Sequence, residues 1–260
     1  EPDQKKIKNV INTYKIENVL LINNGQITTP TGSLLMKSGS LTWNVTPVKN
    51  LKGGYDIYAQ RKDYNLYTGG TWYEGFGKVL EDNYLTSSGK DEKGKIYDKI
   101  DQITNEESFR KNVSSLAGDV YANINQREET IADIFGSSLD LLQNSKNNTK
   151  ENVKINIITG KGSSTEDTSG IESYDYNTYG VLALREVERT YRHKFGYSLG
   201  YTKTDFQMDG SNDEDQADTI QLGLHNKYSV NGWNVKNDLL GRVSFHDVDR
   251  SVNWSGGTTS

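Results

Sequence analysis

The sequence of 260 residues has no cysteine and no long hydrophobic run. A membrane-spanning helix needs roughly 20 consecutive apolar residues, and a chain with a mean hydropathy of −0.76 offers no such segment. The missing run and the low hydropathy exclude a helical membrane protein. A transmembrane β-barrel is compatible with both, because only every second residue of its strands faces lipid. The absence of thiols is typical of bacterial secreted and outer-membrane proteins, although many cytosolic proteins lack them too.

Charge and histidine content also limit the function. The chain has 30 basic and 35 acidic residues, mixed throughout, so no basic surface indicates a nucleic-acid partner. The three histidines, His193, His225 and His246, lack the spacing of metal ligands. The acidic run 209–218 lacks the ligand pattern of a calcium loop, and we expect a solvated loop there. Because no nucleophile elbow or phosphate-binding loop occurs, we expect no enzyme activity, no metal and no cofactor.

The first third of the chain predicts short strands. From Ile7 to about Tyr67 the sequence is rich in Asn, Thr, Gly, Val, Ile and Tyr, and short alternating runs are separated by turn signals at Asn23-Asn24-Gly25 and Gly53-Gly54. Such strands form either the rungs of a β-solenoid or a small β-sheet. The sequence leaves both open.

Residues 92–143 predict a helix instead. Apolar residues recur there at intervals of three, four and seven, which is the spacing of one helix face, and we expect a break near Gly94, Gly118 or Gly136. The apolar face consists of Val113, Leu116, Ala117, Val120, Ile124, Ile131, Phe135, Leu139 and Leu142. The polar face consists of Asp119, Asn123, Asn125, Arg127, Glu128, Glu129 and Asp133.

After a polar linker at 144–150 the hydropathy pattern changes to a period of two, which predicts strands. The stretch 191–202 shows it most clearly, because rings and leucine alternate with small or charged residues, and glycines lie on the polar side. In the second strand we place Tyr174, Tyr176, Leu182 and Leu184 on the apolar face. We expect five strands, at residues 152–160, 173–185, 191–205, 218–229 and 233–246.

The connections between these strands alternate between long and short. The long ones are Lys161–Glu172 and Gln207–Ala217, and the short ones are Glu186–Thr190 and the type I′ hairpin signal Asn231-Gly232. Outer-membrane barrels have this asymmetry, with long extracellular loops and short periplasmic turns. Rings near the strand ends would form the aromatic girdles at the two membrane surfaces. We assign to these girdles Tyr174, Tyr176, Tyr191, Tyr201 and Trp233.

The order of these parts resembles the C-terminal translocator of bacterial type V autotransporters. The likeness is carried by the helix with Ser115–Arg127 (SLAGDVYANINQR), by Tyr176–Leu184 (YNTYGVLAL) and by Phe195–Asp205 (FGYSLGYTKTD). It covers about residues 106–252, and residues 7–84 would be the end of the exported passenger. The specificity lies in a helix, a linker and alternating strands in that order, since no single motif is diagnostic.

The resemblance implies a fold, a location and partners. The fold class is an all-β transmembrane β-barrel of about twelve strands, with a preceding α-helix in its lumen and a β-rich, solenoid-like passenger tail. The domains would be residues 1–90, the end of the passenger; 91–150, a helical linker through the pore; and 151–260, the first part of the barrel. The protein would sit in the bacterial outer membrane with its N-terminal part at the cell surface. Its partners would be outer-membrane lipid, its own passenger, the barrel-assembly machinery and periplasmic chaperones.

The same resemblance gives the site residues. We expect the pore to be lined by Arg185, Arg192, Lys194, Lys236 and Arg242. We expect the pore helix to present Asn123, Asn125, Glu128, Glu129 and Asp133. Glu128, Glu129 or Asp133 should then lie within about 6 Å of a barrel cation, the reach over which charges clearly couple.

Two other functions compete with export. The first is an extracellular β-solenoid adhesin fragment without a membrane barrel, whose turns would recur at a constant interval. The second is an outer-membrane hydrolase barrel, which requires Ser, His and an acid or amide to converge on one rim, and the sequence shows no such set. Five antiparallel strands cannot close a barrel, so the export hypothesis also predicts further strands beyond Ser260.

Overall fold

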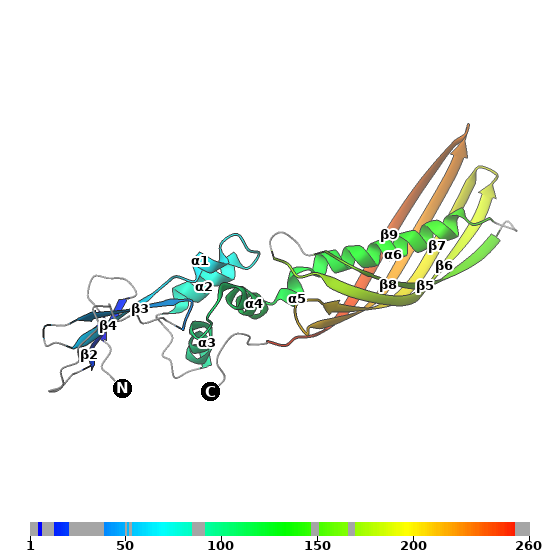
Figure 1. The fold of residues 1–260 in the computed structure, drawn as a ribbon. Coiled ribbons are helices and arrows are strands. Elements are labelled where there is room, and N and C mark those ends of the chain that lie inside the picture. Colours follow the sequence, from blue (N-terminus) through cyan, green and yellow to red (C-terminus); the bar gives the residue numbers. More distant parts are fainter. Residues whose placement is uncertain are drawn as a thin grey trace. The chain divides into compact units, whose positions relative to one another are not determined.

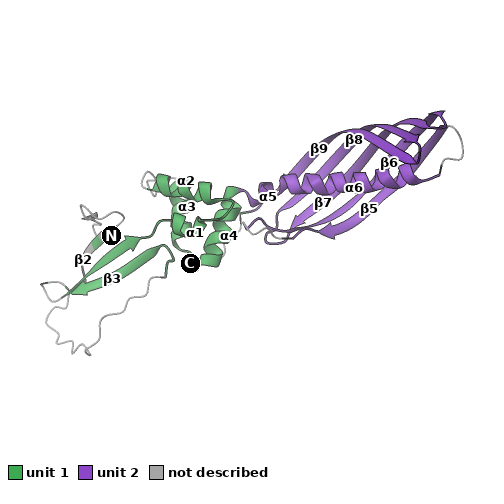
Figure 2. Cartoon of the chain, turned by 90° about the horizontal axis from the view of Figure 1, so that it is seen from above, with its two compact units in different colours: residues 1–117, 252–260 green, residues 118–251 purple. Residues whose placement is uncertain are grey.

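The computed structural model describes residues 5–6, 13–20, 39–49, 51, 54–84, 92–146, 151–165 and 170–252. The chain forms two compact units (Figure 2). Unit 1 comprises residues 1–117 and 252–260, and unit 2 comprises residues 118–251. Each unit has its own hydrophobic core.

Unit 1 begins with a four-stranded antiparallel sheet (Figure 1). The strands β1 (Lys5–Lys6), β2 (Thr13–Leu20), β3 (Trp43–Lys49) and β4 (Tyr55–Arg61) pair in the order β1-β2-β4-β3. Their pairing is antiparallel throughout, whereas the rungs of a parallel β-helix run in one direction. Of the two predictions for this segment, the described strands therefore form the small sheet, and they show no solenoid rung.

Four helices follow in unit 1: α1 (Asn65–Thr68), α2 (Glu74–Tyr84), α3 (Glu92–Asp101) and α4 (Glu106–Ala117). Residues 65–84 were expected to be β-rich and are helical instead, because Tyr73, Leu80 and their neighbours recur at helical spacing and enter a common core. Helices α3 and α4, which the sequence assigned to the linker, contribute to the same core. Its buried members are Tyr64, Tyr67, Tyr73, Leu80, Tyr97, Ile100, Ile103, Phe109 and Val113.

A single carboxylate ties the helices of unit 1 to its sheet. Asp101 Oδ1 accepts hydrogen bonds from Thr42 Oγ1 (2.8 Å) and Tyr64 Oη (2.9 Å). Its other oxygen accepts from Trp43 Nε1 (2.8 Å) and Tyr84 Oη (2.6 Å). The C-terminal end of α3 is thereby held against β3, α1 and α2.

Unit 2 starts where the predicted helix breaks. Gly118 has a φ of 92°, a conformation that favours glycine, and it separates α4 from α5 (Asp119–Ala122). The main helix α6 (Ile124–Asn144) follows, and Gly136, another expected break, lies within it. The apolar stripe that the sequence assigned to one helix thus serves two cores, since Val113 belongs to unit 1 and Val120 to unit 2.

The rest of unit 2 is a five-stranded antiparallel sheet with α6 lying along one face (Figure 1). The strands are β5 (Glu151–Ser163), β6 (Tyr174–Thr190), β7 (His193–Met208), β8 (Glu214–Val230) and β9 (Trp233–Asp249), paired in chain order. The five predicted strands are confirmed, and all are longer than expected. The connection between β7 and β8 accordingly shrinks to residues 209–213. The predicted loop between β5 and β6 loses residues at its start to β5, and its residues 166–169 lie outside the described part of the chain. The described sheet is open, with β5 and β9 at its edges.

The turns at the other end of the sheet are tight. Tyr191 and Arg192 connect β6 to β7, and Asn231 and Gly232 connect β8 to β9. Asn231 has a φ of 49° and Gly232 a φ of 84°, as the predicted type I′ turn requires. No helix in the described part of the chain is long and apolar enough to cross a lipid bilayer.

Candidate functional site

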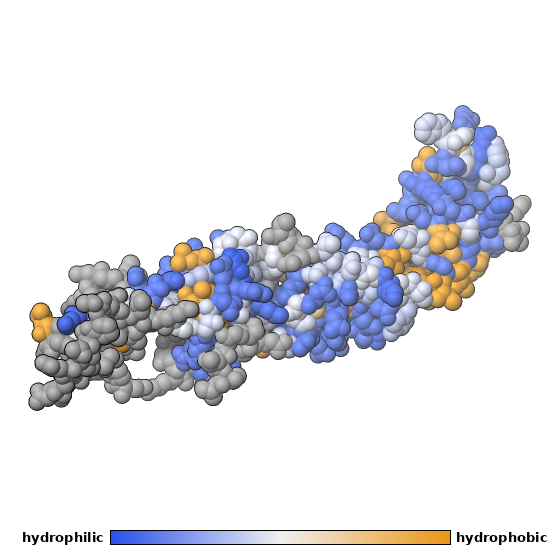
Figure 3. All heavy atoms as spheres, in the orientation of Figure 1, coloured by the Kyte–Doolittle hydropathy of each residue, from blue (hydrophilic) through white to orange (hydrophobic). Residues whose placement is uncertain are grey.

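The sheet of unit 2 has two faces of opposite character. The outer face, away from α6, exposes large apolar side chains, among them Leu199 (55%), Leu222 (60%) and Leu239 (71%). Figure 3 shows an orange area over the sheet of unit 2, with hydrophilic surface on either side of it. A soluble protein rarely exposes so continuous an apolar surface. The band consists of Val153, Ile155, Ile157, Tyr179, Val181, Phe195, Tyr197, Leu199, Tyr201, Ile220, Leu222, Leu224, Tyr228, Trp233, Val235, Leu239, Val243 and Phe245.

Three of the five predicted girdle residues are exposed. Trp233 begins β9 on the outer face, Tyr191 lies in the tight turn, and Tyr201 donates a hydrogen bond from its hydroxyl to Asp218 Oδ1 (2.5 Å). Tyr179 and Tyr197 also face outward, although neither was assigned to a girdle. Their positions in the alternating pattern of their strands were the signal that could have placed them on the outer face.

The girdle prediction is wrong for Tyr174 and Tyr176, which face α6. Tyr174 is 1% exposed and its hydroxyl lies 2.8 Å from Thr130 Oγ1. Tyr176 packs against the same core. The middle of β6 is apolar on both faces, so its alternation did not indicate which face meets the helix.

The same inversion in β6 corrects the prediction for Arg185. Its guanidinium lies on the outer face and donates to Tyr197 Oη (3.2 Å) and Glu151 Oε2 (3.1 Å). Arg192 is not on the helix-facing face either, because it lies in the turn, with its guanidinium over the ring of Tyr191. Lys194, Lys236 and Arg242 lie on the helix-facing face.

Of the predicted helix residues, Glu128 makes the expected ion pair. Its Oε2 lies 3.5 Å from Arg242 Nε. Asn123 is buried and donates from Nδ2 to the carbonyl oxygen of Glu172 (3.0 Å). The structure leaves Asn125, Glu129 and Asp133 exposed.

A buried charge network near the long loops holds α6 to the sheet. Arg127 is fully buried, and its Nε lies 3.2 Å from Asp215 Oδ2. His246 Nδ1 lies 2.7 Å from the same oxygen, and its Nε2 lies 2.9 Å from Glu128 Oε1. The imidazole of His246 thus links the carboxylate of Asp215 on β8 to that of Glu128 on α6. Sequence reasoning missed this network, since Asp215 and His246 join it only through strand register.

Two carboxyl groups meet beside this network. Asp119, at the start of α5, and Asp213 are both buried. Burial raises the pKa of Asp119, and the contact with Asp213 raises it further. Asp213 Oδ1 also accepts from the backbone amide of Ser251 (2.7 Å). The pair is stable when it holds a proton, because two adjacent carboxylates repel each other.

Lysine side chains gather at the other end of the helix-facing face. Lys154 Nζ donates to Glu186 Oε2 (2.6 Å) and to the carbonyl oxygens of Leu142 (2.7 Å) and Ser145 (3.0 Å). It thus binds the negative end of the α6 dipole. Lys194, Lys227 and Lys236 are direct neighbours across β7, β8 and β9.

No Ser, His and acid were predicted to converge on one rim, and the structure brings such a set together beneath α6 instead. Ser198 Oγ lies 2.7 Å from His225 Nε2 on the helix-facing face, and His225 Nδ1 lies 2.8 Å from Asp238 Oδ1. His225 lies 27 positions after Ser198 and 13 positions before Asp238 in the sequence. Only the register of three adjacent strands brings them together, so no local motif could have indicated them.

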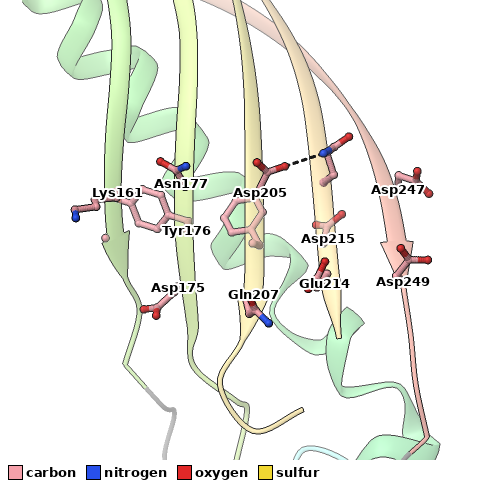
Figure 4. A pocket seen from close by; sticks show the side chains of 13 residues that line it. Lys161, Asp175, Tyr176, Asn177, Asp205, Gln207, Glu214, Asp215, Asp247 and Asp249 are labelled. Atoms are coloured by element: carbon pink, nitrogen blue, oxygen red, sulfur yellow. Dashed lines mark hydrogen bonds between the residues drawn. The ribbon is translucent and has the colours of Figure 1, made fainter. Parts of the chain in front are cut away.

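The long-loop end of the sheet bears an acidic groove of about 950 Å³ (Figure 4). Gln216 Nε2 donates to Asp205 Oδ1 there (2.8 Å). Among the described residues no group of three His, Cys, Asp or Glu side chains is arranged to hold a metal ion. The charged residues that line the groove are Lys161, Asp175, Asp205, Glu214, Asp215, Asp247 and Asp249.

Two family models match the chain. One, described as autotransporter beta-domain, matches residues 153–260 and so includes nearly all of the five-stranded sheet. The other, described as BigA beta sandwich domain, matches residues 9–63 and so includes β2, β3 and β4. No curated protein and no solved structure matches. Residues 153–260 are an autotransporter beta-domain, the translocator of a type V secretion protein of the bacterial outer membrane.

Proposed function

We propose that unit 2 belongs to a closed outer-membrane barrel that exports and anchors the N-terminal part of its own chain. In this proposal β5–β9 are its first strands, and further strands of the same protein pair with the edges at β5 and β9 to complete a barrel of about twelve. Closure is required because unpaired backbone groups at a sheet edge are too costly in lipid.

The apolar outer face carries the proposal. Along β8, for example, Ile220, Leu222 and Leu224 point outward, while the alternating residues Gln221 and His225 are buried under the helix side. This inversion, with apolar side chains outside and polar ones inside, is the pattern of a barrel in a membrane. The long-loop end, with its acidic groove, would face the cell exterior.

Helix α6 occupies what would be the lumen. It packs its apolar stripe on the sheet, and the buried ion pair of Arg127 and Asp215 fixes it there. We infer that the helix fills the pore after export, with residues 1–90 as the end of the passenger at the surface. The export role requires no cofactor. Insertion would depend on the barrel-assembly machinery, periplasmic chaperones and outer-membrane lipid.

An arginine placed in the apolar band tests this function. Leu222→Arg puts a charge in the middle of the band, where it costs about 2–4 kcal/mol in a lipid-facing position. Gln216→Arg is the matched control, on the same face of the same strand but in the acidic groove. We expect the full-length Leu222→Arg protein to be depleted from the outer-membrane fraction and the control to assemble normally. Equal assembly of both variants, or a more soluble and stable Leu222→Arg protein, would contradict membrane insertion.

A further inference from the structure

The Ser198, His225 and Asp238 set on the helix-facing face has the connections of a nucleophile, its base and an orienting acid. Ser198 Oγ to His225 Nε2 is 2.7 Å, and His225 Nδ1 to Asp238 Oδ1 is 2.8 Å. Activated serine sites on unrelated folds share these two contacts. We propose that this set is a latent esterase site, in which Ser198 attacks carboxylic esters once the last turn of α6 is lifted away. The proposal goes beyond export, which uses none of these groups.

A glycine makes the Ser–His contact sterically feasible. Gly223 is the direct cross-strand neighbour of Ser198. A Cβ atom at Gly223 would lie 2.5 Å from Ser198 Oγ and 2.7 Å from His225 Nε2. Any larger residue at this position would push the hydroxyl and the ring apart. The contact between Ser198 and His225 therefore requires glycine at position 223.

The neighbouring lysines supply the positive charge that the reaction needs. Lys194, Lys227 and Lys236 form a row across β7, β8 and β9, next to the row that holds His225 and Asp238. Like charges directly opposite one another in a sheet are destabilising, so this row lowers the stability of the sheet. Lys194 Nζ lies 4.0 Å from Glu188 Oε2, and Lys236 Nζ donates to Asn144 Oδ1 (3.0 Å). In this proposal Lys227, between them in the row, stabilises the oxyanion. The row also favours an ester that carries a negative group near the scissile bond.

The chemistry balances without a cofactor. His225 Nδ1–H donates to Asp238, which leaves Nε2 free to take the proton of Ser198. The serine oxygen bonds to the acyl carbon, the carbon–oxygen bond to the alcohol breaks, and Nε2 returns the proton to the leaving alkoxide. Water then attacks the acyl-serine by the same route, giving the acid and restoring Ser198. The net reaction converts an ester and water to a carboxylic acid and an alcohol.

Helix α6 masks the site in the described state. Ser198 is 2% and His225 5% exposed. Gln143, in the last turn of α6, covers them and donates from Nε2 to Asp238 Oδ1 (2.9 Å). Lys154 holds that turn in place, because its Nζ donates hydrogen bonds to the carbonyl oxygens of Leu142 and Ser145. These bonds do not involve Ser198, His225 or Asp238. Releasing Lys154 should therefore uncover the serine.

The test is labelling of the full-length protein, in detergent, with a fluorophosphonate probe, from which the serine oxygen displaces fluoride. We expect slow labelling of Ser198 in the wild type and at least about tenfold faster labelling in Lys154→Gln, the change expected from losing charge-assisted hydrogen bonds. Lys161→Gln, on the opposite face of the same strand, is the matched control and should label like the wild type. Mass spectrometry of the labelled peptide identifies the residue.

Four variants built on Lys154→Gln separate chemistry from packing. Ser198→Ala should abolish the label. Ser244 is a helix-facing serine that accepts a hydrogen bond from Thr219, and Ser244→Ala should leave the label unchanged. His225→Gln should slow labelling by about 10²–10⁴-fold, the range for loss of a general base. Asp238→Asn should alter the pH profile of the labelling rate, which a purely structural role would leave in place.

The proposal is overturned if Lys154→Gln carries no label on Ser198, or if His225→Gln reacts as fast as its parent. Heat-modifiable migration in electrophoresis, a property of folded barrels, is measured on every sample. A protein that migrates as a folded barrel but does not label refutes the esterase site and leaves export standing. A protein that never forms a barrel refutes the proposed export function instead.

Discussion

Gly200 sets how closely α6 approaches the sheet. A Cβ atom there would lie 2.6 Å from Cε1 of Phe135 and 2.8 Å from Cδ1 of Leu182, both fully buried. Gly200→Val should destabilise unit 2 by about 1–3 kcal/mol, the usual cost of overpacking. Gly241→Val is the control, since no atom lies within 4 Å of a Cβ on Gly241. Thermal unfolding of the purified full-length protein in detergent measures both, and an equal effect of the two variants would show that the helix is not seated as described.

Asp215 is the only carboxylate in the described residues within ion-pair distance of buried Arg127. Asp215→Asn leaves that arginine buried without its counter-charge and also removes a partner of His246. We expect a loss of about 3–5 kcal/mol, the range for breaking a buried pair from one side. Asp247→Asn, in the exposed acidic groove, should change stability little. Thermal unfolding in detergent measures the stability of both variants. An Asp215→Asn protein as stable as Asp247→Asn would refute the role of the buried charge network in holding α6 to the sheet.

At the scale of single residues the sequence predicted that Glu128, Glu129 or Asp133 would pair with a cation of the strands, and in the structure Glu128 pairs with Arg242. It could not predict Arg185 or Tyr174, because β6 is apolar on both faces and only packing against α6 determines which face is inside. The contacts of His225 and His246 depend on cross-strand register, which a single sequence encodes only through the lengths of its turns.

At the scale of elements, the ion pair between β4 and α2 should make unit 1 sensitive to acid. The guanidinium of Arg61 donates to both oxygens of Glu81 and lies over the ring of Tyr84. Burial alone would raise the pKa of Glu81, but the hydrogen bonds from Arg61 and from the Tyr64 amide lower it below its usual value. A lowered folded-state pKa stabilises the fold above the unfolded value, about 4.3 for Glu, and this stability is lost as the pH falls through the folded value.

Hydrogen exchange of α1 and α2 measures this effect. We expect protection to be constant near neutral pH and to fall in wild type below about pH 4.3, after correction for the intrinsic exchange rate. Glu81→Gln should lower protection at neutral pH and remove most of the acid dependence, while Glu74→Gln, at the exposed start of α2, should keep it. The same acid dependence in Glu81→Gln and wild type would contradict the assignment.

Elements with strong periodicity were predictable and the others were not. The five strands of unit 2 and the Asn231-Gly232 turn followed from alternation and from a residue pair suited to positive φ. Helices α1 and α2 were missed because their tyrosines and glycines have low helix propensity, and tertiary burial around Tyr64 and Phe109 overrides it.

At the scale of the whole molecule, the chain combines an N-terminal unit with its own core and a sheet whose apolar surface points outward. The order of parts was readable from the sequence because a change of period, from helix to strand, marks the start of the sheet. The division at Gly118 could not be predicted from the sequence, because the apolar stripe continues across it. Only the positive φ of Gly118 separates α4 from α5.

Protease treatment of intact cells that express the full-length protein tests whether unit 1 is exported across the outer membrane. Antibodies against unit 1 and against residues 151–252 follow the two parts. Our account predicts that protease added outside removes unit 1 while the β-domain persists in the outer-membrane fraction. Survival of unit 1 in intact cells, with digestion only after the outer membrane is permeabilised, would contradict it.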